Sequence, residues 1–115
     1  METLIVDGPT PLKGEIEVAG AKNSMSKLLT ASMLTAEPCE FTNVPAIGDT
    51  EITKAICEAL GAHCSEIGPK ALLVETPDMP VAAVPEALAV QNRLSVMMLA
   101  PLVHRHGRAV VPAAG

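Results

Sequence analysis

The stretch from residue 15 to residue 36 places a strand-like and a helix-like pattern on either side of a short glycine-led turn. Residues 15–18 alternate polar and apolar side chains, which is typical of a half-buried strand. After the turn, apolar residues recur at helical spacing until Pro38 approaches, and a proline disfavours helix in the residue before it. A strand followed at once by a helix indicates an α/β chain.

The same two patterns alternate along the rest of the sequence. Asp49 or Thr50 is expected to cap the second helix and Gly61 to end it. Pro101 should bend or interrupt the third helix, because an interior proline costs about 3 kcal/mol unless the surroundings adapt. From Glu15 to Glu75 the predicted order is βαβαββ. The expected strands are 4–6, 15–18, 39–44, 62–67, 71–75 and 109–111, and the expected helices are 24–36, 48–60 and 85–106.

The turn at 20–23 delivers Lys22 to the start of the first helix. Asn23 or Ser24 can cap that helix by accepting a hydrogen bond from a free backbone N–H. The remaining N–H groups and the positive end of the helix dipole favour an anion, and a lysine ammonium adds a full charge. The turn could therefore hold a phosphate or a carboxylate. The alternative is a solvated lysine in an ordinary strand-to-helix turn.

The sequence around this turn resembles the opening of the UDP-N-acetylglucosamine 1-carboxyvinyltransferase family of enolpyruvyl transferases. The Gly-Ala-Lys-Asn element at 20–23 is specific, because the sister enzymes of the shikimate pathway carry an Asp-Lys-Ser version there. The resemblance covers essentially the whole chain but only the opening part of the family's length. The segments that carry it are 14–23, 36–38, 42–45, 48–49, 93–95 and 99–103.

The resemblance implies a fold of βαβαββ units, which form two inside-out α/β barrel domains in this family. Residues 21–115 would supply about one and a half units of the first domain. Residues 1–20 would form strands that belong to the other, C-terminal domain. The implied partner is therefore the missing C-terminal portion of the same fold.

The resemblance also implies an activity, the first committed step of peptidoglycan synthesis. The family transfers the enolpyruvyl group of phosphoenolpyruvate to the 3′-hydroxyl of UDP-N-acetylglucosamine and releases phosphate. Lys22 matches a catalytic lysine that contacts phosphoenolpyruvate, Asn23 matches its neighbour in that site, and Arg93 matches an arginine that binds the UDP-sugar. Gly115 lies at or next to the position of the family's catalytic cysteine, so the general acid is unknown. No metal and no cofactor are implied.

Two other interpretations stay open. The chain could use another nucleotide or a small alcohol as acceptor, or it could be a truncated, non-catalytic remnant of the family. Alone, these residues are not expected to complete an active site. The histidines and cysteines follow no zinc spacing, and the cysteines are expected to be buried small hydrophobes. The residues concerned are Cys39, Cys57, His63, Cys64, His104 and His106.

Charge and composition exclude several function classes. The formal net charge is −5 and Phe41 is the single aromatic residue, so neither a basic footprint nor a stacking platform for nucleic acid is present. The longest apolar run, 96–103, is far shorter than the ~20 residues of a membrane span. An odd number of cysteines without a disulfide pattern fits a reduced, cytoplasmic setting.

Overall fold

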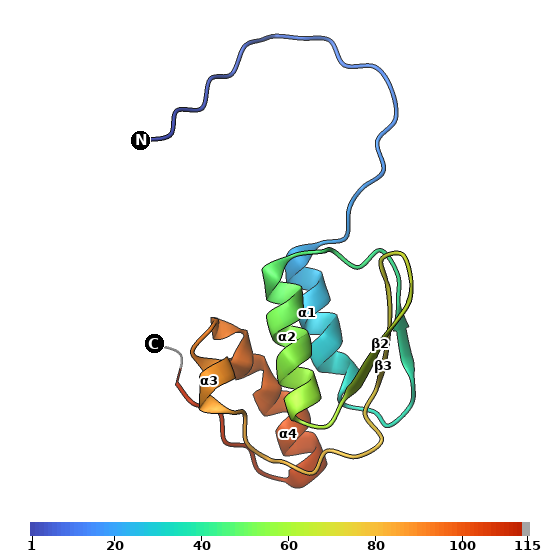
Figure 1. Ribbon diagram of the computed structural model, residues 1–115, viewed down its shortest axis with the longest axis vertical. Coiled ribbons are helices and arrows are strands. Elements are labelled where there is room, and N and C mark those ends of the chain that lie inside the picture. Colours follow the sequence, from blue (N-terminus) through green and yellow to red (C-terminus); the bar gives the residue numbers. More distant parts are fainter. Residues whose placement is uncertain (114–115) are drawn as a thin grey trace.

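Two helices that run side by side in the same direction form the middle of the fold in this computed structural model, which describes residues 1–113 (Figure 1). Helix α1 spans Lys22–Ser32 and helix α2 spans Gly48–Ala59. Leu29 and Ile56 are fully buried in the core that the two helices share. A buried hydrogen bond from Thr53 Oγ1 to Ser26 Oγ, 3.4 Å long, also joins them.

A three-stranded antiparallel sheet covers one side of this helix pair (Figure 1). The strands are β1 (Cys39–Phe41), β2 (His63–Gly68) and β3 (Ala71–Glu75), in the order β1-β3-β2. Alternate β3 residues, Leu72 and Val74, are buried toward the helices. The predicted hairpin is confirmed. The predicted strand 39–44 ends early because Asn43 adopts a positive φ of 54°, which a strand cannot accommodate.

Three short helices complete the fold: α3 (Glu86–Ala89) and the 3-10 helix η1 (Arg93–Met98) pack against the pair, and α4 (Leu99–His106) packs against η1. The prediction of one helix over 85–106 is wrong. Asn92 is extended and its side chain accepts a hydrogen bond from the Leu94 N–H at 2.9 Å, so a new helix begins there. Pro101 is the third residue of α4. Because the first N–H groups of a helix have no partner within it, a proline at this position removes no hydrogen bond of α4. Gly107 ends α4 in the left-handed conformation, as predicted.

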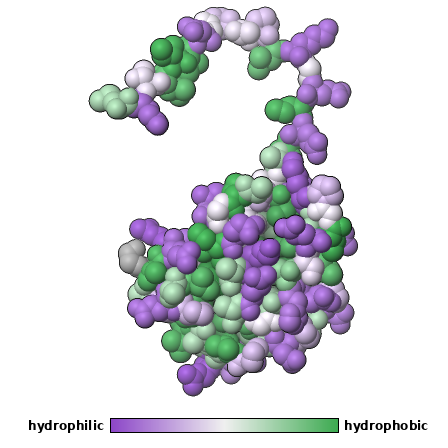
Figure 2. Space-filling model, in the orientation of Figure 1, coloured by the Kyte–Doolittle hydropathy of each residue, from purple (hydrophilic) through white to green (hydrophobic). Residues whose placement is uncertain are grey.

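The first 20 residues form an extended segment, most of which stands clear of the folded part (Figures 1 and 2), while Val18 and Gly20 contact the loop at Asn43. The strands predicted at 4–6 and 15–18 are absent from this structure. Ile16 and Val18 are 91% and 78% exposed, and neither pairs with the backbone of a second strand, as a strand requires. The observed order is therefore αβαββ rather than βαβαββ. The strand predicted at 109–111 is reduced to one parallel bridge between Ala83 and Val110.

Several helix ends differ from the expected ones. Helix α1 ends at Ser32, whose hydroxyl donates to the Leu29 carbonyl, before the expected stop near Pro38. Helix α2 ends before Gly61, which has a φ of 118° and terminates the helix as predicted. In the described part of the chain, no helix combines the length and apolarity needed to cross a membrane.

Candidate functional site

The N-terminal ends of α1 and α2 lie beside each other, at the end of the folded part where the extended segment joins it (Figure 1). Helix α1 begins two residues earlier than predicted and α2 begins at Gly48 as predicted, with Ala21 and Ile47 as N-cap residues, and neither has a side-chain cap. The expected caps, Asn23 or Ser24 and Asp49 or Thr50, lie inside the first turns instead. Backbone N–H groups of a first turn have no partner within the helix. Two positive dipole ends therefore point the same way from neighbouring positions.

An ion pair joins the first turns of the two helices. Lys22 Nζ lies 2.8 Å from Asp49 Oδ2, and the two side chains are 62% and 30% exposed. An exposed pair of this kind stabilises a fold by about 0–1 kcal/mol, so its main effect is to orient the ammonium. Asn23 is exposed in the same turn of α1. The site therefore presents one oriented cation and two helix ends to solvent.

A close backbone approach sets the path of the chain into α1. An added Cβ on Gly20 would lie 1.9 Å from the Asn43 carbonyl oxygen, so only glycine fits there. The Asn43 side chain donates a hydrogen bond to the Val18 carbonyl at 3.1 Å. Sequence reasoning missed Asn43 and treated Asp49 only as a cap. An asparagine before Val-Pro is the available signal, because asparagine tolerates a positive φ.

Arg93 is on a different element from this pair of helix ends. It is the exposed first residue of η1. Within residues 1–113 its guanidinium forms neither an ion pair nor a hydrogen bond. The structure thus brings Lys22 and Asn23 together but does not join Arg93 to them. Gly115 lies outside the described residues.

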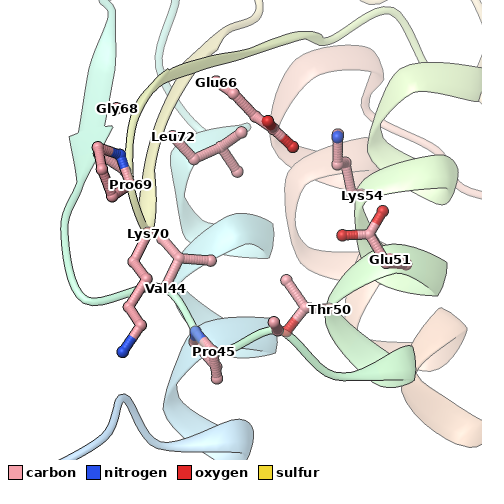
Figure 3. Close-up of a pocket in the computed structure, with 12 residues that line it drawn as sticks. Val44, Pro45, Thr50, Glu51, Lys54, Glu66, Gly68, Pro69, Lys70 and Leu72 are labelled. Atoms are coloured by element: carbon pink, nitrogen blue, oxygen red, sulfur yellow. The ribbon is translucent and has the colours of Figure 1, made fainter.

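A cavity of about 230 Å³ lies between the first turns of α2 and the β2–β3 hairpin (Figure 3). Lys22, Asn23 and Arg93 do not line it. Figure 3 shows the Lys70 ammonium pointing away from the side chains of the α2 turns. Thr50 Oγ1 is buried without a hydrogen-bond partner in the described part of the chain. The lining residues are Val44, Pro45, Ala46, Thr50, Glu51, Lys54, Glu66, Gly68, Pro69, Lys70, Ala71 and Leu72.

Two of the three thiols, those of Cys57 and Cys64, are not activated nucleophiles. Burial raises the pKa of Cys57 far above its usual range and raises that of Cys64 to about 11, so both stay protonated near neutral pH. Cys39 is partly buried and all three are free thiols. Among residues 1–113 no three His, Cys, Asp or Glu side chains are grouped as metal ligands would be.

Comparison with known proteins places this chain among the carboxyvinyltransferases. The sequence profile of EPSP synthase (3-phosphoshikimate 1-carboxyvinyltransferase) matches residues 6–113. The chain belongs to this family. The enolpyruvyl transferase NikO from Streptomyces tendae has a similar structure, with a TM-score of 0.72 and 28% identity over 84% of this chain and 22% of that one. The predicted α/β fold class is therefore confirmed.

Similar curated proteins carry the name expected from the sequence. UDP-N-acetylglucosamine 1-carboxyvinyltransferases of Protochlamydia amoebophila and Chlamydia pneumoniae are 37% and 38% identical to this chain over its whole length. UDP-N-acetylglucosamine 1-carboxyvinyltransferase 1 of Carboxydothermus hydrogenoformans is 39% identical over the same span. The matches cover 25%, 26% and 27% of those proteins, so the chain spans about a quarter of their length. The resemblance seen in the sequence is confirmed.

Proposed function

We propose that Lys22 and Asn23, at the paired starts of α1 and α2, bind phosphoenolpyruvate in an enolpyruvyl transferase. This transferase would act on UDP-N-acetylglucosamine and catalyse the first committed step of peptidoglycan synthesis. The 3′-hydroxyl of the sugar would add to C2 of phosphoenolpyruvate while a proton is added to C3. Elimination of phosphate and loss of a C3 proton would then give the enolpyruvyl ether. The intermediate carries both a phosphate and a carboxylate, so fixed positive groups are needed around it.

The observation that carries the proposal is the pair of uncapped helix starts next to Lys22. Backbone N–H groups at a helix N-terminus favour phosphate and carboxylate. The Lys22 ammonium lies beside them, with Asp49 as the counter-ion at 2.8 Å. An incoming anion would take the ammonium's free donors without leaving a buried charge behind, because both side chains remain partly exposed.

The roles of the individual residues follow the family match. Lys22 would act as the catalytic cation on phosphoenolpyruvate, and Asn23 would donate to the same substrate from the first turn of α1. Arg93 would bind the diphosphate of the UDP-sugar, because a guanidinium donates in a planar fork. Its exposed position, without a partner among residues 1–113, supports that role by leaving the fork free. The general acid stays unassigned.

The proposal includes the arrangement of the domains. Residues 1–20 would pair as strands with the C-terminal portion of the fold, and residues 21–115 would form part of the first domain. Apolar side chains along the extended segment support this, since Leu4 and Leu12 are 90% and 94% exposed. The setting would be cytoplasmic, where UDP-sugars are available and thiols stay reduced.

The test joins residues 1–113 to the rest of the Protochlamydia amoebophila relative in place of its matching quarter. Phosphate release from phosphoenolpyruvate with UDP-N-acetylglucosamine is then measured. We expect Lys22→Ala to lower kcat/KM roughly 10- to 150-fold, the effect of a charge-assisted hydrogen bond of ~1.5–3 kcal/mol. Lys27→Ala, an exposed lysine of the same helix, is the matched control and should leave the rate unchanged.

The outcomes separate the parts of the proposal. Equal rates for Lys22→Ala and the unsubstituted protein would contradict the role of Lys22. Phosphate release with 3-phosphoshikimate but not with the UDP-sugar would keep enolpyruvyl transfer and overturn the acceptor. An Arg93→Ala variant should raise KM for the UDP-sugar and leave KM for phosphoenolpyruvate unchanged.

A further inference from the structure

One asparagine lies at the crossing of the extended segment and the loop before α2. We propose that Asn43 is a positioning residue that fixes the direction in which the chain enters α1 and thereby holds Lys22 against Asp49. The link to substrate rests on the function proposed above. The effect of Asn43 on how rigidly residues 18–20 are held does not depend on that function.

Asn43 holds the incoming chain from two sides. Its side-chain amide donates to the Val18 carbonyl at 3.1 Å. Its own carbonyl lies where a Cβ of Gly20 would be, and the ring of Pro45 closes the same space at 3.0 Å. Among the hydrogen bonds of residues 1–113, the bond to Val18 is the one that ties residues 1–20 to the folded part. The path of the chain is therefore set four residues before the Lys22 ammonium.

The asparagine is itself held in place. Its φ of 54° lies in the left-handed region, which asparagine tolerates better than most residues. The following residue, Val44, donates its N–H to the Lys70 carbonyl at 2.9 Å, so the loop is anchored to the hairpin. The position of the extended segment is thus fixed relative to the hairpin through Asn43.

The same loop leads directly into α2 and its first-turn residue Asp49. Asn43 therefore connects the two chain segments whose ends form the Lys22–Asp49 pair. Each segment enters its helix from this crossing. Loosening the crossing should let α1's first turn move relative to that of α2, and the pair would lose its fixed geometry.

The experiment compares substitutions that separate the amide from other properties of the residue. Asn43→Gly keeps the positive φ accessible and removes the amide. Asn43→Asp keeps the size and replaces the donor by an acceptor, which would face the Val18 carbonyl. Lys70→Gly is the matched control, because Lys70 also has a positive φ (53°) but does not bond the extended segment through its side chain.

The first readout is the heteronuclear ¹⁵N NOE of the 115-residue chain. In the unsubstituted protein and in Lys70→Gly, we expect rigid amides from residue 18 onward. In Asn43→Gly and Asn43→Asp, rigid amides should begin only at residue 21. Rigid amides at 18–20 in both Asn43 variants would overturn the proposal. Unfolding midpoints measured in parallel identify any variant whose change is only a general loss of stability.

The second readout is the dissociation constant for phosphoenolpyruvate, followed by amide shifts in α1. Asn43→Gly should weaken binding roughly 2- to 12-fold, the range that corresponds to one intramolecular hydrogen bond. Lys70→Gly should change it less than 2-fold. Equal affinities for Asn43→Gly and the unsubstituted chain would overturn the positioning role. If the unsubstituted chain does not bind phosphoenolpyruvate, the proposed function fails, and the order readout still decides the role of Asn43.

Discussion

Replacing Gly20 by alanine should displace Lys22 while costing little stability. The new Cβ would lie 1.9 Å from the Asn43 carbonyl oxygen, whereas Cβ atoms essentially never come within 3.0 Å of such an atom. One of the two backbones must therefore move by about 1 Å. Residues 1–19 are exposed and make little other contact, so the extended segment can swing away. The loss in unfolding free energy is then limited to the released contact, about 0.5–1.5 kcal/mol.

The same substitution at two other glycines gives stability changes with which that of Gly20→Ala can be compared. Gly61→Ala cannot relax in the same way, because Gly61 lies between α2 and β2 with a φ of 118° and its Cβ would meet the Asp78 carbonyl at 2.6 Å. It should cost about 1–3 kcal/mol. Gly48→Ala meets nothing within 4 Å at the start of α2. It should leave stability unchanged or raise it by up to about 1 kcal/mol.

Urea unfolding of the three variants, combined with amide spectra, tests the ranking. With a slope of ~1–3 kcal/mol/M, Gly20→Ala should lower the midpoint by about 0.2–1.5 M. The amides of residues 21–23 should nevertheless shift, because the start of α1 has moved. A stability loss for Gly20→Ala as large as that for Gly61→Ala would contradict the claim that the extended segment is free to move away from Asn43. Unshifted amides at 21–23 would refute the positioning of Lys22 by this close approach.

Three further predictions concern the core and the loops. Leu29→Ala removes a fully buried side chain between α1 and α2 and should cost about 2–5 kcal/mol, measured by urea unfolding. Arg105→Met removes two hydrogen bonds, 2.7 and 3.0 Å long, to loop carbonyls after β3 and should lower the midpoint, whereas the same change at exposed Arg108 should not. Stability should fall as pH rises above about 9, because an unfolded thiol ionises there while burial keeps Cys64 protonated up to a pKa of about 11. Flat stability between pH 9 and 11 would contradict that assignment.

The sequence predicted the elements whose signals are local. The hairpin, the end of α2 at Gly61 and the end of α4 at Gly107 follow from backbone preferences of a few residues, and all three are confirmed. The long third helix was wrong because one asparagine can end a helical pattern by bonding the backbone ahead of it. Apolar spacing contains no information about such a side-chain bond.

The candidate site was only partly predictable for a similar reason. Lys22 follows from its place at a glycine-led helix start, and its position there is observed. Its partner Asp49 is 27 residues away in the chain and becomes its neighbour only when α1 and α2 pack side by side. Asn43 depends on the same packing. The strands at 4–6 and 15–18 could not form in this structure because strand pairing needs a second strand, which periodicity alone does not supply.

The most direct test of the central claim is a titration of the ¹⁵N-labelled chain with phosphoenolpyruvate. We expect saturable amide shifts at residues 22–24 and 48–50, the first turns of α1 and α2, and their loss in Lys22→Ala with the rest of the spectrum unchanged. Shifts confined to the cavity beside the hairpin, or no saturable shifts at all, would contradict an anion site at the paired helix ends.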